Sequence, residues 1–251
     1  MITYEYPLNE KIRTLLRLED LYDKVRYFCA KADRREHHTA LVILFEILDV
    51  ATRADLKSEL LQEMERQKQT LEVLRNNPNV DLQRLELVLR DIERTSASLL
   101  AGTGKFGQHL RENEWLMGIK QRSSIPGGAC EFDLPSYHYW LNQDVEARQR
   151  DLNVWLQPIA AVNDGARIVL KLLRESAQQH SAMAYQGVYQ QVPAGRVAQM
   201  IRISLAAEFH CVPEISANKY ALNIRFISVG TASRSHLCEQ DVEFQLSFCN
   251  L

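Results

Sequence analysis

The pattern of apolar and polar positions divides the chain into a long helical part and a shorter part of strand character. Between about residues 9 and 177, apolar side chains recur at three- and four-residue spacings, which predicts amphipathic helices. Beyond residue 180, β-branched and aromatic residues alternate with polar ones, which predicts antiparallel strands. The predicted fold class is therefore α+β, with an N-terminal helical bundle domain and a C-terminal antiparallel β-domain.

Capping residues and helix-breaking residues set the expected helix boundaries. Asn9 is predicted to cap the first helix, Thr52 with Asp55 resembles a capping box, and Asn76-Asn77-Pro78 is predicted to end a helix. Pro158 and Gly165 are positions where the last helix is expected to kink. Helices are expected at about residues 9–31, 35–50, 52–75, 81–100, 106–122 and 144–177, with a helical turn at 136–140.

The N-terminal segment is predicted to belong to the β-domain. Residues 2–6 alternate and carry β-branched and aromatic side chains, which favours a short strand ended by Pro7. Because an isolated strand must pair its backbone groups, we expect this strand to complete a sheet with distant strands. Those strands are expected at residues 188–191, 198–206, 220–229 and 242–248. The predicted domains are residues 8–180, and residues 181–251 together with strand 2–6.

Charge and cysteine content exclude several classes of protein. The 251 residues carry 30 basic and 32 acidic side chains, a net charge of −2, so no global basic field exists to hold nucleic acid. The five cysteines are widely spaced and form no CxxC, which argues against a disulfide framework and a zinc site. No apolar run approaches the roughly 20 residues that span a bilayer, so a cytosolic protein without a membrane anchor is expected.

Candidate catalytic motifs have poor sequence context. Residues 102–107 match GxGxxG, but a helical segment precedes them where a dinucleotide site needs a strand, so an interhelical loop is predicted. His37 and His38 are not part of an HExxH motif and are expected on a solvated helix start. No GxSxG motif or triad pattern is visible. We therefore predict a protein that is not an enzyme, with no catalytic residue, metal or cofactor.

Basic residues on helical faces are the remaining signal. Arg13 and Arg17 stand four apart on one helix, where like charges repel unless Glu10 and Asp20 compensate them. Elsewhere, Arg53 and Lys57 lie in the opening turns of a helix, where the dipole disfavours cations, whereas Lys120 and Arg122 end a helix, where cations are favoured. These residues form either a functional basic patch or ordinary solvated faces. A nucleic-acid-binding module and a small-ligand-binding helical module remain as alternatives.

Residues 122–135, RSSIPGGACEFDLP, are too particular to be a generic linker. The Ile-Pro-Gly-Gly run within this segment favours a tight non-helical reversal, because proline fixes φ and glycine admits positive φ. With PLNEKIRTLLRLE at 7–19, EILDVATRADLKSELLQEMERQ at 46–67 and NKYALNIRF at 218–226, it makes the chain resemble the ZapD family over nearly its whole length. Members of that family bundle filaments of the tubulin-like division protein FtsZ.

The resemblance implies a helical domain plus a β-domain, a symmetric homodimer, and a positively charged surface that binds the acidic and apolar C-terminal tail of FtsZ. A dimer has two tail sites and can crosslink filaments at the division site in the cytoplasm, at mid-cell. Neither nucleic acid nor membrane is an expected partner. Glu114 departs from the family, since relatives can carry a basic residue there. The positions that match basic or polar family positions are Arg17, Arg53, Lys57, Arg122 and His138.

Overall fold

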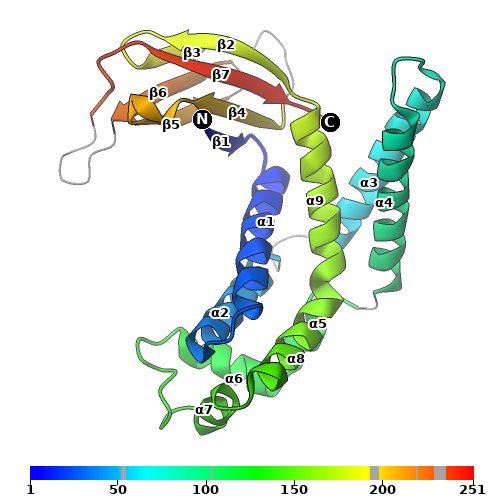
Figure 1. The fold of residues 1–251 in the computed structure, drawn as a ribbon, viewed down its shortest axis with the longest axis vertical. Coiled ribbons are helices and arrows are strands. Elements are labelled where there is room, and N and C mark those ends of the chain that lie inside the picture. The colour runs from blue at the N-terminus through cyan, green and yellow to red at the C-terminus, as the bar shows by residue number, and fades with distance from the viewer. Residues whose placement is uncertain (52–54, 103, 193–197, 219, 229–235) are drawn as a thin grey trace. The chain divides into compact units, whose positions relative to one another are not determined.

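The computed structural model describes residues 1–51, 55–102, 104–192, 198–218, 220–228 and 236–251. The chain forms two compact units (Figure 1). The helical unit comprises Thr14–Val169, and the β unit comprises Met1–Arg13 together with Leu170–Leu251. The predicted α+β fold class is confirmed, with helices in the first part of the chain and antiparallel sheets that the N-terminal strand completes.

The elements follow in chain order. The helices and 3-10 turns are α1 (Glu10–Cys29), α2 (Arg34–Ala51), α3 (Leu56–Val73), η1 (Leu74–Asn76), α4 (Leu82–Ala101), α5 (Gln108–Arg111), α6 (Glu114–Ser123), α7 (Pro135–Leu141), α8 (Val145–Leu156), η2 (Gln157–Ile159), α9 (Ala160–Glu175) and η3 (Ala207–Phe209). The strands are β1 (Ile2–Pro7), β2 (Gln178–Ala184), β3 (Val188–Gln191), β4 (Met200–Leu205), β5 (Cys211–Ala217), β6 (Leu222–Ser228) and β7 (Val242–Cys249).

Side-chain caps begin the helices where the sequence predicted them. Asn9 Oδ1 accepts a hydrogen bond from the backbone N–H of Ile12 at 2.8 Å, and Asp81 caps α4 in the same way. Each cap satisfies a backbone donor that the first turn leaves without an intrahelical partner. The cap of α3 is Asp55, which accepts from the N–H of Ser58. Thr52, the predicted start of its capping box, lies outside the described residues.

The single helix expected over residues 106–122 is wrong, because the chain forms two helices there. Asn113 stands between α5 and α6, and its side chain accepts from the N–H of Leu116 at 3.0 Å. A side chain that bonds locally to the backbone favours a helix start over a helix interior. Gly107 precedes α5 with φ of 65°, where a Cβ would lie 2.4 Å from Leu48 Cδ2, so this position requires glycine.

The long helix expected over residues 144–177 is interrupted once, by η2 around Pro158. Proline lacks the N–H of the helical ladder, so a break there follows directly from the sequence. In contrast to the expectation, α9 continues through Gly165. A Cβ at Gly165 would lie 3.4 Å from Leu60 Cδ1 and 3.5 Å from Leu99 Cδ1. These are ordinary van der Waals distances, so α9 packs against α3 and α4 here without the space itself requiring glycine.

Helices α3 and α4 form the antiparallel hairpin that their short connection predicted (Figure 1). Lys68 Nζ lies 2.8 Å from Glu93 Oε1, and near the tip of the hairpin Arg75 Nε lies 3.0 Å from Glu86 Oε1. As the residue number on the α3 side rises from 68 to 75, the number of its partner on α4 falls from 93 to 86, as antiparallel neighbours require. Both pairs are partly exposed and contribute little to stability individually.

The buried Arg148 side chain on α8 connects several turns of the helical unit. It is 5% exposed, and its guanidinium donates to His37 Nδ1 at 2.9 Å and to the carbonyls of Ala32, Leu141 and Gln143 at 2.7, 3.0 and 2.5 Å. These carbonyls lie at or just past the C-terminal ends of α1 and α7, where helix dipoles favour a cation. Within the described ranges Arg148 forms no ion pair with a carboxylate.

The expectation that His37 and His38 lie on a solvated helix start is wrong. His37 is fully buried, and because Arg148 only donates, His37 Nδ1 accepts while its Nε2–H donates to the Lys31 carbonyl at 2.8 Å. Burial lowers the pKa of His37, and the charge of Arg148 lowers it further. His38 Nδ1 lies 2.7 Å from the Tyr137 hydroxyl, and burial lowers the pKa of His38 too. His37 is therefore part of the core, whereas His38 is half-buried.

The β unit contains two antiparallel sheets, of strand order β1-β4-β7-β2 and β3-β6-β5. The prediction that the N-terminal strand pairs with a distant C-terminal strand is confirmed. Ile2 of β1 pairs with Leu205 of β4, and at the other end of the ladder Pro7 pairs with Met200. The β unit is thus discontinuous in sequence.

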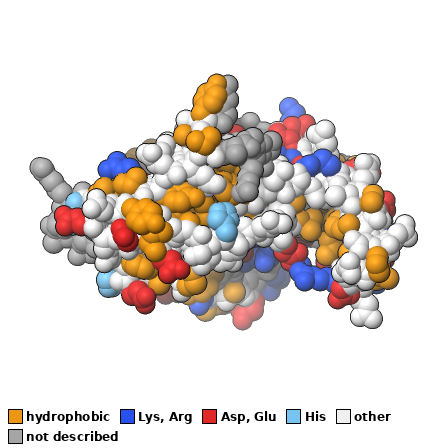
Figure 2. Space-filling model, turned by 90° about the horizontal axis from the view of Figure 1, so that it is seen from above, with side chains coloured by type: hydrophobic (Ala, Val, Ile, Leu, Met, Phe, Trp, Pro, Cys, Tyr) orange, Lys and Arg blue, Asp and Glu red, His pale blue; other side chains and the backbone are white. Residues whose placement is uncertain are grey.

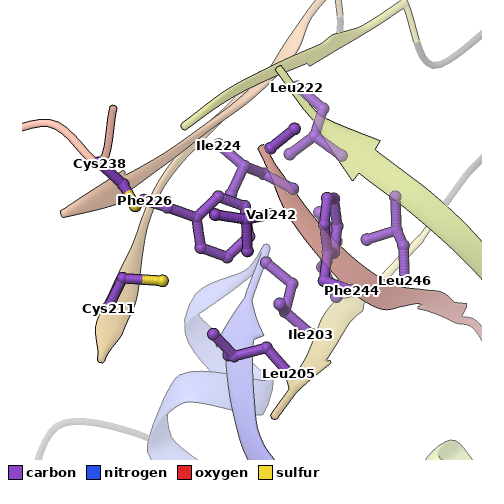
Figure 3. Packing of buried hydrophobic residues seen from close by; sticks show 12 residues of the cluster. Ile203, Leu205, Cys211, Leu222, Ile224, Phe226, Cys238, Val242, Phe244 and Leu246 are labelled. Carbon is purple, nitrogen blue, oxygen red and sulfur yellow. The ribbon is translucent and has the colours of Figure 1, made fainter. Parts of the chain in front are cut away.

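The inner faces of the two sheets share one hydrophobic core (Figure 3). Phe244 of β7 packs against Phe226 of β6 with ring centroids 5.0 Å apart, and against Tyr189 of β3 at 5.3 Å in an edge-on geometry. Burial of large aromatic side chains supplies much of the stabilisation of a sandwich of this size. Cys211 and Cys238 lie at one end of this core as small buried side chains, the role predicted for most of the cysteines.

Strands β2 and β5 were not predicted. The sequence of β2, QQHSAMA, is mostly polar or small, and β5 contains Pro213. Both are edge strands, in which proline and polar residues are tolerated because one side of the backbone has no strand partner. Local pattern therefore understates the number of strands at sheet edges.

Glu5 connects β1 to its surroundings through side chains as well as backbone. Arg174 of α9 donates to both Glu5 carboxylate oxygens at 2.8 and 2.7 Å, and Arg202 Nε of β4 lies 3.1 Å from Glu5 Oε1. The Glu5 side chain is only 19% exposed, so solvent screens these contacts incompletely. A two-pronged arginine–carboxylate contact is also geometrically specific.

Deleting residues 1–6 is expected to lower the free energy of unfolding by about 2–5 kcal/mol. The deletion removes the β1 ladder, opens the edge of β4 and leaves Arg174 and Arg202 without Glu5. Glu5→Gln, which keeps the strand, is the matched control and should cost less. Denaturant unfolding followed by circular dichroism measures both. An unchanged midpoint for the truncated protein would contradict the role assigned to β1.

The stability of the helical unit is expected to fall as pH decreases below about 6.5, the ordinary histidine pKa. Since the folded-state pKa of His37 is depressed, the unfolded chain binds a proton in this range that the folded chain does not. Each such histidine contributes a slope of at most about 1.4 kcal/mol per pH unit. Unfolding free energies at pH 5.5 and 7.5 measure it. His37→Gln should reduce the difference, because it removes the group whose pKa burial lowers.

Candidate partner-binding site

The residues proposed from the sequence occupy four described positions in the helical unit. Arg17 lies on α1, Lys57 in the first turn of α3, Arg122 in the last turn of α6 and His138 on α7. Arg53 lies outside the described residues. The contacts of each side chain show whether its charge already has an internal partner.

Arg17 is an exposed cation without an ion pair among the residues that the structure describes. The neighbouring acids pair elsewhere, Glu10 with Arg13 and Asp20 with Lys24, each at 2.5 Å. Glu10 therefore compensates the charge of Arg13, whereas neither Glu10 nor Asp20 pairs with Arg17. A solvated guanidinium with no internal partner can pair with an acidic ligand without first breaking a contact of its own.

Lys57 has a structural contact. Its Nζ donates to the carbonyl of Gly102 at 2.6 Å, and Gly102 is the C-cap of α4. The ammonium thereby satisfies a carbonyl at a helix C-terminus, where the dipole favours positive charge. Substitution of Lys57 would disturb the end of the α3–α4 hairpin as well as any surface charge.

Arg122 and His138 flank the same loop. Arg122 Nη1 lies 3.8 Å from Asp133 Oδ1, and His138 Nδ1 lies 3.7 Å from Glu131 Oε2. The loop turns back as the sequence predicted, with a hydrogen bond from the Gly128 N–H to the Ile125 carbonyl at 2.9 Å. The structure therefore brings two of the candidates to the two ends of one loop. No described contact joins either of them to Arg17 or Lys57.

Aromatic packing fixes the helix that carries His138. Tyr137 and Trp140 of α7 stack with ring centroids 5.9 Å apart, and Trp115 of α6 contacts both, at 6.2 and 6.0 Å. The Trp140 indole N–H donates to Asp151 at 2.8 Å. Burial raises the pKa of Tyr137, so its hydroxyl stays protonated. His138 consequently projects from a rigid support.

The groove between α2 and α6 differs in character from a basic site. It has a volume of about 410 Å³, with Phe45 and Met117 among its apolar lining and Glu46, Asp49 and Lys120 among its charged lining. Lys120 pairs with Asp49 across it. Lys120, one of the two cations that end α6, therefore has an internal partner. The acidic side chains make this groove a poor place for an acidic ligand.

Several exposed cations without a described ion pair were not singled out from the sequence. They include Lys105, Arg150, Lys171 and Arg225. Sequence spacing identifies neighbours on one helix but not contacts between elements, so it could not separate these residues from paired ones. On the face shown in Figure 2, acidic and basic side chains are interspersed rather than gathered into a field of one sign.

Comparison with known proteins identifies the family. The ZapD family, described as a cell division protein, matches residues 16–225. The chain belongs to the ZapD family. Cell division protein ZapD of Aromatoleum aromaticum is 56% identical over 251 residues, covering 100% of this chain and 98% of that protein. The ZapD proteins of Azoarcus sp. strain BH72 and Chromobacterium violaceum are 53% and 54% identical, with 100% and 99% of each chain covered.

Membership of the ZapD family assigns the chain a role in cell division. All of the proposed partner-binding positions fall within the matched residues 16–225. No helix in the described part of the chain is long and apolar enough to cross a membrane. Across the described ranges, no group of three or more His, Cys, Asp and Glu side chains is placed to hold a metal ion.

Proposed function

We propose that this ZapD-family protein is a non-enzymatic division factor that binds the acidic and apolar C-terminal tail of FtsZ through exposed basic residues of its helical unit. Family membership supports the cell division role, and the observation that carries the proposed site is the exposed guanidinium of Arg17, which has no ion pair with any described residue. Arg122 and His138 contribute from the loop they flank, and Lys57 and Arg53 complete the proposed set. A tail that carries carboxylates is attracted to such cations at little desolvation cost.

The proposed action on filaments is crosslinking by a homodimer. One tail site per protomer gives two sites per dimer, and two simultaneous contacts strengthen a modest single-site affinity. Apolar side chains on the α3–α4 hairpin support self-association. Val73, Leu82, Leu87 and Leu100 are 75, 52, 56 and 67% exposed. Their apolar area is available for a second protomer to bury.

Sedimentation with polymerised FtsZ tests the proposal. The protein is expected to sediment with filaments and to bundle them, and to lose both effects when FtsZ lacks its C-terminal tail. Binding should weaken as salt rises, because exposed charges are screened over about 8–10 Å at physiological ionic strength. Equal cosedimentation with tailless filaments would overturn the tail as the binding element.

Arg17→Glu is expected to abolish bundling while leaving the fold intact. The substitution replaces an unpaired cation by a carboxylate that repels the acidic tail, and a loss of about 2–4 kcal/mol weakens binding roughly 30- to 1,000-fold. Lys171→Glu makes the same change of net charge at an exposed cation outside the proposed set, and should bundle like the parent protein. Retained bundling by Arg17→Glu at low salt would place the tail site elsewhere.

The family resemblance and the exposed apolar side chains of the α3–α4 hairpin lead us to expect a homodimer at micromolar concentration. A stable dimer would bury about 1,200 Å² or more in total. Sedimentation velocity of the parent protein and of Arg17→Glu measures the mass of each, and both should give the dimer. A monomer for the parent protein would contradict crosslinking by two tail sites. A monomer for the variant alone would show that Arg17 acts through assembly instead of through the tail.

A further inference from the structure

The β unit contains a pocket where its two sheets open at one end. Cross-strand partners point to the same face of a sheet, so the register shows which side chains face the sandwich interior. On β2, Gln178 is paired with Phe248 and His180 with the core residue Leu246. The inner positions of β2 therefore change from alanine at residues 182 and 184 to histidine and glutamine at residues 180 and 178.

Strand β3, the edge strand of the other sheet, also carries polar side chains at inward-facing positions. Tyr189 pairs with Ile224 and Gln191 with Leu222, and both partners belong to the hydrophobic core. Tyr189 and Gln191 thus face inward. His180 and Gln191 are half-buried at these positions and Gln178 is exposed, so their polar groups are accessible to water or to a ligand.

These side chains line a cavity of about 680 Å³, which we call the mouth pocket. Its volume is in the range of small-molecule sites, about 300–1,000 Å³. The residues that line it are Ser176, Gln178, Gln179, His180, Tyr189, Gln191, Phe248 and Asn250. None of them is Lys, Arg, Asp or Glu, so the pocket offers no permanent charge to an ionic ligand.

Carboxamides supply several of the donors and acceptors in the mouth pocket, beside the hydroxyls of Ser176 and Tyr189 and the His180 ring, and one carboxamide is oriented. The Tyr189 hydroxyl donates to Gln191 Oε1 at 2.9 Å, which leaves the two N–H donors of the Gln191 amide to other groups. Within the described residues, the side chains of Gln178, Gln179 and His180 have no protein hydrogen-bond partner. The pocket therefore presents both donors and acceptors beside one another.

A parallel pair of aromatic rings lies beside these amides. The rings of His180 and Phe248 are nearly parallel, with an interplanar angle of 13° and centroids 6.0 Å apart. Aromatic faces stack on flat heteroaromatic rings, and a glutamine or asparagine amide pairs with a ring edge that carries an adjacent donor and acceptor. Adenine, with its N6 amino group beside N7, has such an edge.

We propose that the mouth pocket binds an uncharged heteroaromatic ring of the purine class, stacked on His180 and Phe248 and hydrogen-bonded by Gln191 and Gln178. The absence of cations in the lining sets the specificity, because a phosphate group on the ligand gains no contact there. The site is in the β unit and is independent of the FtsZ tail site proposed for the helical unit.

Isothermal titration of the full-length protein with adenosine, adenosine monophosphate and N-acetylglucosamine tests the proposal. Adenosine is expected to bind, the monophosphate to bind no more tightly, and the sugar not to bind. Gln191→Leu should weaken adenosine binding about tenfold or more, because it removes the oriented amide. Gln190→Leu is the matched control, since residue 190 alternates to the outer face of the same strand, and it should bind like the parent protein.

The opposite results would overturn the assignment. Undetectable adenosine binding at millimolar concentration, or equal binding by Gln191→Leu and the parent protein, would remove the site. Tighter binding of the monophosphate would point to a charged site elsewhere, and sugar binding that depends on Gln191 would replace the purine by a polyol. Circular dichroism of each variant establishes that the fold is retained. FtsZ bundling by Gln191→Leu is expected to match the parent protein.

Discussion

The guanidinium of Arg148 is the interaction on which the organisation of the helical unit depends. It is buried, and carbonyls of two helix ends together with His37 receive its hydrogen bonds in place of a carboxylate. An arginine can satisfy several acceptors at once because its donors radiate in a plane. Removing it would break all of these hydrogen bonds at once, and the buried His37 would lose the donor to its Nδ1. The connections between α1 and α2 and between α7 and α8 are therefore held by one side chain.

The hydrogen bonds of Arg148 also hold α7, the helix that carries His138 of the proposed site. Helix α7 is fixed between Arg148, which binds the Leu141 carbonyl at its end, and the aromatic cluster of Trp115, Tyr137 and Trp140. His138 therefore projects from a rigid support, and Arg17 projects from a helix whose next turn is held by the Tyr22 hydroxyl donating to Ile159 O at 2.8 Å. A rigid surface loses little conformational entropy on binding, which favours a flexible partner that must itself become ordered.

The β unit follows a different principle, since it is closed by pairing segments from opposite ends of the chain. Strand β1 covers the edge of β4, and Glu5 secures it with Arg174 and Arg202. At the opposite edge of the same sheet, β2 and the facing β3 turn polar side chains inward, and the mouth pocket results. The two edges of one sheet thus serve stability and, by our proposal, ligand binding.

The sequence by itself determined the elements with strong local signals. Asn9 and Asp81 begin helices, Pro158 interrupts one, and residues 2–6 form a strand, because capping, proline chemistry and alternation act within a few residues. The family resemblance was equally readable from residues 122–135 and has been confirmed by comparison. These features depend on neighbours along the chain and need no knowledge of distant contacts.

Only the tertiary structure decided which polar groups have partners. Arg17 and Lys57 look alike in sequence, yet Lys57 binds the Gly102 carbonyl and Arg17 has no described ion pair. His37 and His38 are adjacent to charged residues in the chain, yet His37 is buried against α8 and His38 is half-buried against α7. Edge strands such as β2 carry a weak local pattern because one side lacks a strand partner. Burial, ion pairing and the pairing of weakly patterned edge strands such as β2 all join residues far apart in sequence, which is why local periodicity could not predict them.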